Sequence, residues 1–212
     1  MATVITVAQQ KGGSGKTTLT THLACELAAR GERVALIDLD PQGSLGRWFM
    51  QRYDRETGLK GDITFTTASP WGIPLEIKKL GADHDVVLID TPPKIDSDLR
   101  PALKAADLVV VPVSASQVDL WATEGVLELA ARDGHRPLVV LNRARGGTRL
   151  TGSICEALGE LEADAAETVI AQRQAYAEAI GAGQGVCEYP GAKLAAAEVA
   201  ALTDEVLARV RG

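Results

Sequence analysis

The sequence predicts an α/β fold in which a mostly parallel, twisted sheet carries helices on both faces. Short β-branched runs alternate with longer Ala- and Leu-rich stretches along the 212 residues. Within the short runs the apolar residues are continuous instead of alternating, as in strands that are buried on both faces. Strand–helix alternation requires crossover connections, which place parallel strands side by side beneath the helices.

The predicted elements follow from these two patterns. The β-branched runs predict strands at 3–8, 33–39, 62–69, 85–90, 108–113 and 137–142. Helical composition and spacing predict helices at 16–30, 97–106, 117–132, 148–160 and 192–211, and residues 167–183 are expected to form a last strand that runs into a helix. Since no repeat or linker interrupts this order, we expect residues 1–212 to form one domain, with its ligand site at the carboxyl ends of the strands.

Composition and charge narrow the classes of function. The net charge of −6 argues against a protein that coats nucleic acid with its whole surface, although it permits a local basic patch. Cys25, Cys155 and Cys187 are scattered, so a disulfide framework or a zinc site is not expected. No apolar run approaches the roughly 18 residues that span a bilayer, and the N-terminus enters a strand directly. We therefore expect a cytoplasmic protein.

A glycine-rich loop, "QQKGGSGKTT" at 9–18, follows the first predicted strand and precedes a helix. Gly12, Gly13 and Gly15 allow a sharp turn that directs several N–H groups at one point, where the helix N-terminus adds its partial positive charge. This arrangement suits a triphosphate. Lys16 would then reach the outer phosphates, and the Thr17 hydroxyl would lie beside a shared Mg²⁺ ion.

Three aspartates occur where a Mg·ATP site needs carboxylates. Asp38 and Asp40 lie in "LIDLDPQGS" just past the second strand, and Asp90 ends another strand in "VVLIDTPP". An unpaired acid at the end of a buried apolar strand is costly unless a cation or hydrogen-bond donors meet it. A metal ion is the simplest partner, although Asp38 alone could also be a strand-end cap.

The stretch "KGGSGKTT" resembles the deviant Walker A motif of the ParA/MinD group of P-loop ATPases, although Gln10 stands where the strict pattern has glycine. In that family a signature lysine precedes the usual one. The resemblance implies that Lys11 contacts nucleotide phosphate across the interface of an ATP-sandwich dimer, while Lys16 serves its own site. Two ammonium groups repel each other unless an anion lies between them, which is consistent with this reading.

The resemblance also implies roles for the other site residues. Catalysis would involve Lys11, Lys16 and Asp40, with Asp40 orienting or activating the attacking water. Mg²⁺ would be held by Thr17, by Asp90 through water and by Asp38 in support. The residues implied to bind ATP are Lys11, Gly12, Gly13, Ser14, Gly15, Lys16, Thr17, Thr18, Asn142 and Pro190.

Adenine recognition is implied at two of these positions. The amide of Asn142 could both donate to and accept from a base edge, although asparagine is also a common turn residue at a strand end. The segment "EYPGAK" at 188–193, which contains Pro190, resembles the loop that closes over the base.

Later segments are similar to the short ParA proteins that segregate plasmids or position protein cargo. No helix-turn-helix precedes the first strand, so we expect DNA binding that is independent of sequence and dependent on salt. Candidate contacts, which could equally be solvated surface residues, are Arg143, Arg145, Arg149, Arg173 and Lys193. The implied partners are a second copy of the chain, non-specific DNA and a ParB-like or cargo-linked activator, with nucleoid association in the ATP state.

Two other classes stay open as alternatives. One is an ATP-dependent ligase similar to the cobyrinic acid diamide synthase group, which usually carries further substrate-binding sequence. The other is a MinD-like membrane cycler, but the C-terminal helix balances its basic residues with Glu198, Asp204 and Glu205, so stable membrane binding is not expected. A nitrogenase-reductase-like electron carrier does not fit, because the cysteines are not placed to share a cluster.

Overall fold

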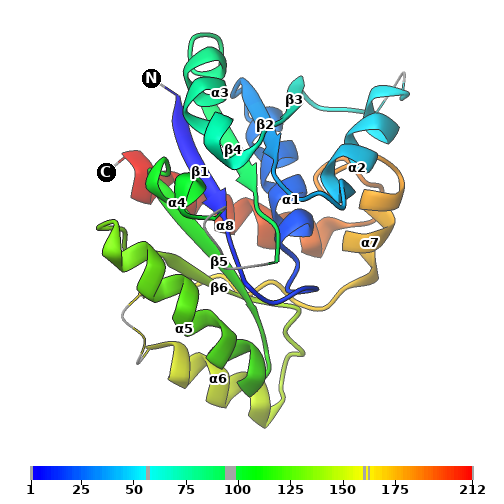
Figure 1. Ribbon diagram of the computed structural model, residues 1–212. Coiled ribbons are helices and arrows are strands. Elements are labelled where there is room, and N and C mark those ends of the chain that lie inside the picture. The colour runs from blue at the N-terminus through cyan, green and yellow to red at the C-terminus, as the bar shows by residue number, and fades with distance from the viewer. Residues whose placement is uncertain (1, 56–57, 94–98, 160, 162, 212) are drawn as a thin grey trace.

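The computed structural model describes residues 2–55, 58–93, 99–159, 161 and 163–211. Within these residues a seven-stranded sheet has the order β3-β2-β4-β1-β5-β6-β7, and each of its ladders is parallel (Figure 1). The strands are β1 (Thr3–Val7), β2 (Val34–Asp38), β3 (Ile63–Thr67), β4 (Val86–Asp90), β5 (Leu108–Ser114), β6 (Leu138–Asn142) and β7 (Asp164–Ala165).

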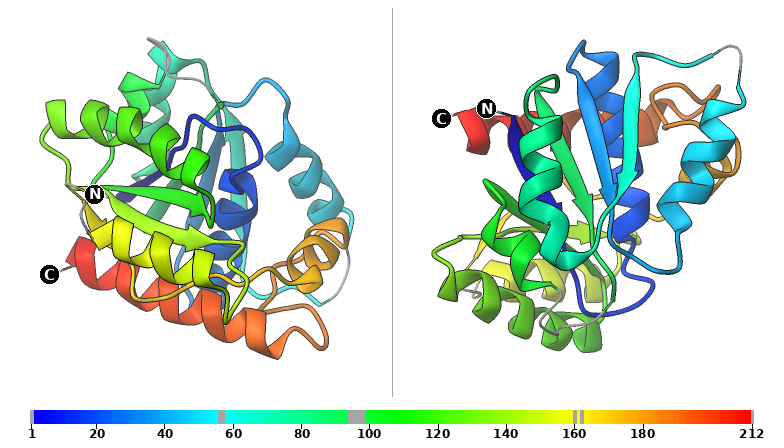
Figure 2. Two further views of the ribbon diagram at one scale, coloured as in Figure 1. Left: turned by 90° about the horizontal axis from the view of Figure 1, so that it is seen from below. Right: turned by 45° about the horizontal axis from the view of Figure 1, so that its top comes forward.

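Helices cover both faces of this sheet (Figure 2). One face carries α1 (Lys16–Ala29), α2 (Ser44–Tyr53), α7 (Gln174–Gly181) and α8 (Lys193–Arg211). The other carries α3 (Ile73–Leu80), preceded by the 3₁₀ turn η1 (Pro70–Gly72), then α4 (Arg100–Lys104), α5 (Gln117–Arg132) and α6 (Arg149–Gly159). In the part of the chain described, no helix has the length and apolar character needed to cross a membrane.

The continuous apolar runs of the sequence are explained by this two-sided cover. Every residue of β2, β4 and β6 is buried. The edge strand β3 is only partly buried, which matches its mixed sequence ITFTT. The predicted α/β fold with a mostly parallel sheet is confirmed.

The helix that follows the glycine-rich loop is held from outside by the C-terminal helix. Leu23 and Leu27 of α1 and Val199 and Leu202 of α8 belong to one core cluster, each at most 1% exposed. Burying an aliphatic side chain of this size contributes about 1.5–3 kcal/mol. The packing therefore fixes the position of α1, on which the phosphate-binding loop depends.

The last predicted strand is the main error in the sequence prediction. The structure has only the short β7 before it, Ala171 makes an isolated bridge to Ala144, and α7 begins at Gln174. The carboxylate of Glu205 on α8 accepts hydrogen bonds from the N–H groups of residues 167 and 168. These backbone donors are thus satisfied by a helix side chain instead of by a strand ladder.

Two helices were not predicted, and one prediction extends beyond the described residues. Helix α2 packs so closely on β3 that a Cβ at Gly46 would lie 3.2 Å from the Phe65 ring, so this glycine is a close-packing site within a helix. Helix α3 was also missed. In the predicted helix 97–106, residues 97 and 98 lie outside the described residues, and the helix is observed as α4.

Candidate active site

The glycine-rich loop connects β1 to α1 with its backbone in the geometry expected of an anion site. Gly13 and Gly15 have φ angles of 80° and 95°, in the left-handed region that favours glycine. Helix α1 has no side-chain cap and no acidic residue in its first turn. Its N-terminal N–H groups and partial positive charge are therefore available to a phosphate group. The Ser14 hydroxyl is buried without a hydrogen-bond partner among the described residues, as expected if a bound group completes the site.

Gly15 also allows the loop to approach β6. The side-chain Nδ2 of Asn142 donates to the Ser14 carbonyl at 2.8 Å, and a Cβ built on Gly15 would lie 2.4 Å from the same nitrogen. Gly12 differs, because its Cβ would have Pro93 Cβ at 3.9 Å as its nearest neighbour and its φ is not left-handed.

Replacing Gly15 by alanine is expected to lower the free energy of unfolding by about 2 kcal/mol or more, since a left-handed φ costs an L-residue about 1–2 kcal/mol and the clash adds to it. Gly12→Ala is the matched control and should cost far less. Urea unfolding of both variants measures the difference. Equal losses would contradict the close approach of the loop to Asn142.

Two carboxylates meet beside the loop, where β2 and β4 end in register at Asp38 and Asp90. The Thr17 hydroxyl donates to Asp90 Oδ2 at 2.6 Å, while Asp90 Oδ1 is buried without a partner among the described residues. Burial and, to a smaller extent, the Asp38 charge raise the pKa of Asp90 to about 7, against the opposing effects of the Thr17 hydrogen bond and the Lys16 ammonium group. A buried carboxylate oxygen without a partner, beside a second carboxylate that repels it, fits a hard cation such as Mg²⁺.

Lys16 begins α1 beside these acids and is 7% exposed. Burial lowers the pKa of its ammonium group, and the carboxylates of Asp90 and Asp40 counteract part of that shift. A buried ammonium at the head of an uncapped helix is suited to bind phosphate oxygens.

Two backbone N–H groups of the segment after β2 donate hydrogen bonds to the Asp38 carboxylate. Asp38 Oδ1 accepts from the Asp40 N–H at 2.9 Å, and Asp38 Oδ2 accepts from the Gly46 N–H at 3.2 Å. Asp40 itself is half-buried, and its Oδ1 accepts from the Gln42 N–H at 2.9 Å. Asp38 and Asp40 also line a cavity of about 500 Å³, whose other walls include residues of α2, β3 and η1.

Lys11 is paired with an acid that the sequence analysis did not single out. Its Nζ contacts Oδ1 of Asp119, in the first turn of α5. The Lys11 side chain is 40% exposed and that of Asp119 is 6% exposed. The two lysines of the loop therefore have separate environments, with Lys16 beside the acids at the strand ends and Lys11 at the outer surface near α5.

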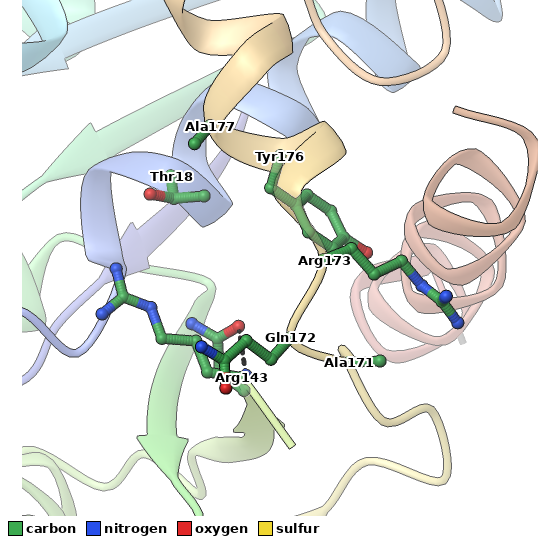
Figure 3. A pocket seen from close by; sticks show the side chains of 8 residues that line it. Thr18, Arg143, Ala171, Gln172, Arg173, Tyr176 and Ala177 are labelled. Carbon is green, nitrogen blue, oxygen red and sulfur yellow. Dashed lines mark hydrogen bonds between the residues drawn. The ribbon is translucent and has the colours of Figure 1, made fainter. Parts of the chain in front are cut away.

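A cavity of about 200 Å³ lies beyond the loop (Figure 3). Its walls come from α1, the end of β6 and the segment leading into α7, and the residues lining it are Thr18, Asn142, Arg143, Ala171, Gln172, Arg173, Tyr176 and Ala177. The lining does not include Pro190, which is exposed. The amide of Asn142 is already engaged, because its Oδ1 accepts from the Arg143 N–H at 2.9 Å. Tyr176 and Gln172 are lining residues that the sequence analysis missed.

The structure brings three of the five candidate DNA contacts to the segment at 171–173. Arg143 and Arg173 line the same cavity, and Arg145 Nε donates to the Gln172 side chain at 2.9 Å. Arg173 is paired with Glu198 at 2.6 Å, so its charge is locally neutralised. Arg149 at the start of α6 and Lys193 at the start of α8 are exposed.

The parallel sheet, the uncapped helix after the glycine-rich loop and the facing carboxylates define a P-loop nucleotide-binding protein. Residues 5–186 match the family model described as the CobQ/CobB/MinD/ParA nucleotide binding domain, and the chain belongs to this family. As a member it is an ATPase that uses ATP and Mg²⁺.

Named relatives and a solved structure agree with this assignment. The chain is 30% identical to the maintenance of carboxysome distribution protein A of Halothiobacillus neapolitanus, over 97% of both chains. It is 33% identical to the chromosome-partitioning ATPase Soj of Thermus thermophilus, over 98% of this chain and 96% of Soj. The cobyrinic acid a,c-diamide synthase of Mycobacterium smegmatis, solved with bound ADP and magnesium, is similar in fold with a TM-score of 0.75 and 21% identity, covering all of this chain and 96% of that one.

Proposed function

We propose that this ATPase is a positioning switch, in which ATP and Mg²⁺ join two copies face to face, the dimer binds DNA without sequence preference, and a partner attached to the cargo stimulates hydrolysis. The observation that carries the proposal is the position of Lys11. The buried Lys16 already provides an ammonium group beside the carboxylates, whereas the Lys11 side chain is 40% exposed and can be reached by a second copy. The names of the carboxysome-distribution and chromosome-partitioning relatives support a role in moving cargo.

Each residue of the site has a defined task in this cycle. The backbone of the loop and Lys16 would bind the phosphates, while Thr17 and Asp90, the latter through water, would hold Mg²⁺ with Asp38 in support. The metal ion neutralises phosphate charge when bound. Asp40 orients the attacking water, because phosphoryl transfer depends mainly on positioning and charge neutralisation.

Lys11 changes partner during the cycle. In the free chain it is paired with Asp119, and in the dimer it contacts the phosphates bound by the second copy. Loss of the γ-phosphate weakens the attraction of the ammonium group to the nucleotide, so the lysine returns to Asp119 and the dimer opens. The segments near Asp40 and Asp90 respond to the same event.

DNA binding is assigned to the exposed cations Arg143, Arg145, Arg149 and Lys193. Arg173 contributes less, because Glu198 neutralises it. With a net charge of −6 over the chain, contact with DNA is confined to this surface. Since such contacts release counterions, affinity should fall steeply with salt. The ATP state is then associated with the nucleoid in the cytoplasm.

Binding to a random-sequence DNA duplex, measured by fluorescence anisotropy with ADP and with ATP, tests the proposal. We expect binding only with ATP, and a loss of affinity of about 40- to 150-fold between 50 and 200 mM salt for three or four phosphate contacts. Arg143→Ala and Arg149→Ala should weaken binding, while Lys104→Ala on α4 serves as the control. Absence of binding in every nucleotide state would reject the DNA role and favour the ligase or membrane alternatives.

A further inference from the structure

Two large apolar side chains are exposed at the start of α5, the helix whose Asp119 pairs with Lys11. Val118 is 56% exposed and Trp121 is 59% exposed. They lie on the outer side of the same turns whose inward-facing Asp119 pairs with Lys11. Exposed apolar side chains of this size are informative where they gather beside a functional group.

The first turns of α5 are tied to the phosphate-binding loop by a second connection. Gln9 Nε2 donates to the Thr123 hydroxyl at 2.9 Å, and that hydroxyl donates to the Asp119 carbonyl at 2.8 Å. Gln9 and Thr123 are both buried. The loop and the start of α5 therefore form one rigid unit. A partner that contacts Lys11 consequently finds α5 in a fixed position relative to the loop.

The reach of a lysine side chain limits where a partner can lie. From Cα to Nζ it spans about 6 Å, so a phosphate bound by a second copy must come close to the surface that carries Lys11. Side chains of a helix lean toward its N-terminus, so Val118 and Trp121 lean toward the end of α5 at which Asp119 pairs with Lys11. A stable interface covers about 800 Å² on each partner, a footprint that extends well beyond one lysine.

We propose that Val118 and Trp121 are apolar anchors of the interface with a second copy of this chain, an inference that rests on the proposed ATP-dependent dimer. In a two-fold symmetric dimer both copies contribute Val118 and Trp121, so the interface contains each of these side chains twice. Tryptophan is enriched among residues that dominate interface energy, and the exposed polar neighbours Gln117 and Glu124 suit a rim that excludes water.

Sedimentation velocity with the non-hydrolysable analogue AMP-PNP and Mg²⁺ tests the inference on the full chain. We expect Trp121→Glu to raise the dimer Kd by about tenfold or more. Trp71→Glu, which alters an 84% exposed tryptophan on η1, is the matched control and should change it by less than about twofold. A wild-type chain that stays monomeric would overturn the dimer itself. A wild-type dimer that Trp121→Glu forms equally well would overturn only the role of α5.

A second measurement remains valid if the glutamate variant does not fold. In Trp71→Phe the remaining tryptophans are the buried Trp48 and the exposed Trp121. With AMP-PNP we expect the emission to move to shorter wavelength and acrylamide quenching to fall, both in step with dimer concentration. Emission that responds only to added DNA, or that does not change while the dimer forms, would overturn the inference.

Discussion

Replacing Lys11 by alanine is expected to abolish ATP-dependent dimerisation while the monomer still binds ATP. Each bond from the ammonium group to the partner's phosphate should contribute about 1.5–3 kcal/mol, as hydrogen bonds to charged groups do, and a symmetric dimer contains two of them. The dimer Kd should therefore rise by about two to four orders of magnitude. Sedimentation with AMP-PNP gives the Kd, and a fluorescent ATP analogue gives nucleotide binding.

Two control variants separate this contact from general charge effects. Lys104→Ala removes an exposed lysine elsewhere and should leave the Kd unchanged. Asp119→Asn removes the acid that competes for Lys11 in the free chain, so the dimer should form at the same or a lower protein concentration. If Lys11→Ala dimerises like the wild type, the lysine does not cross the interface.

Much of the fold is determined by patterns that lie within single segments. Continuous apolar runs indicated buried strands because both faces of the sheet are covered, and the burial of β2, β4 and β6 confirms this. Helix α2 could not be found in the same way. Gly46 within this helix allows it to pack closely on Phe65. That contact joins two segments of the chain, so local composition does not reveal it.

Local signals in the sequence indicate only part of the arrangement of the site, for a related reason. The glycine-rich loop and the acids at strand ends are local signals, and in the structure Thr17 is hydrogen-bonded to Asp90 while Asp38 and Asp90 lie in register. The pairing of Lys11 with Asp119 joins residues 108 positions apart, so no periodicity reports it. The available signal was an acid in the first turn of the helix after the 108–113 strand.

Replacing Asp40 by alanine is expected to lower the hydrolysis rate about 10²- to 10³-fold, within the range for loss of a group that orients or activates water. ATP binding should persist. The hydrogen bond from this residue to the Asp38 carboxylate is donated by the main-chain N–H of Asp40 and not by its side chain, so it survives the substitution. The protein should then accumulate as an ATP-bound dimer on DNA. Phosphate release in a single turnover measures the rate, and a normal rate would remove the role of Asp40.

Asp40→Asn distinguishes chemistry from support of the local fold. The asparagine side chain can still accept the hydrogen bond from the Gln42 N–H through its carbonyl oxygen, so the turn is retained, but the negative charge and the basicity of the carboxylate are lost. If Asp40 acts on water, both variants should be similarly slow. If it only supports the turn, Asp40→Asn should hydrolyse ATP nearly as fast as the wild type, while Asp40→Ala remains slow. The ratio of the two rates therefore decides whether this carboxylate belongs to the reaction or to the segment that holds it.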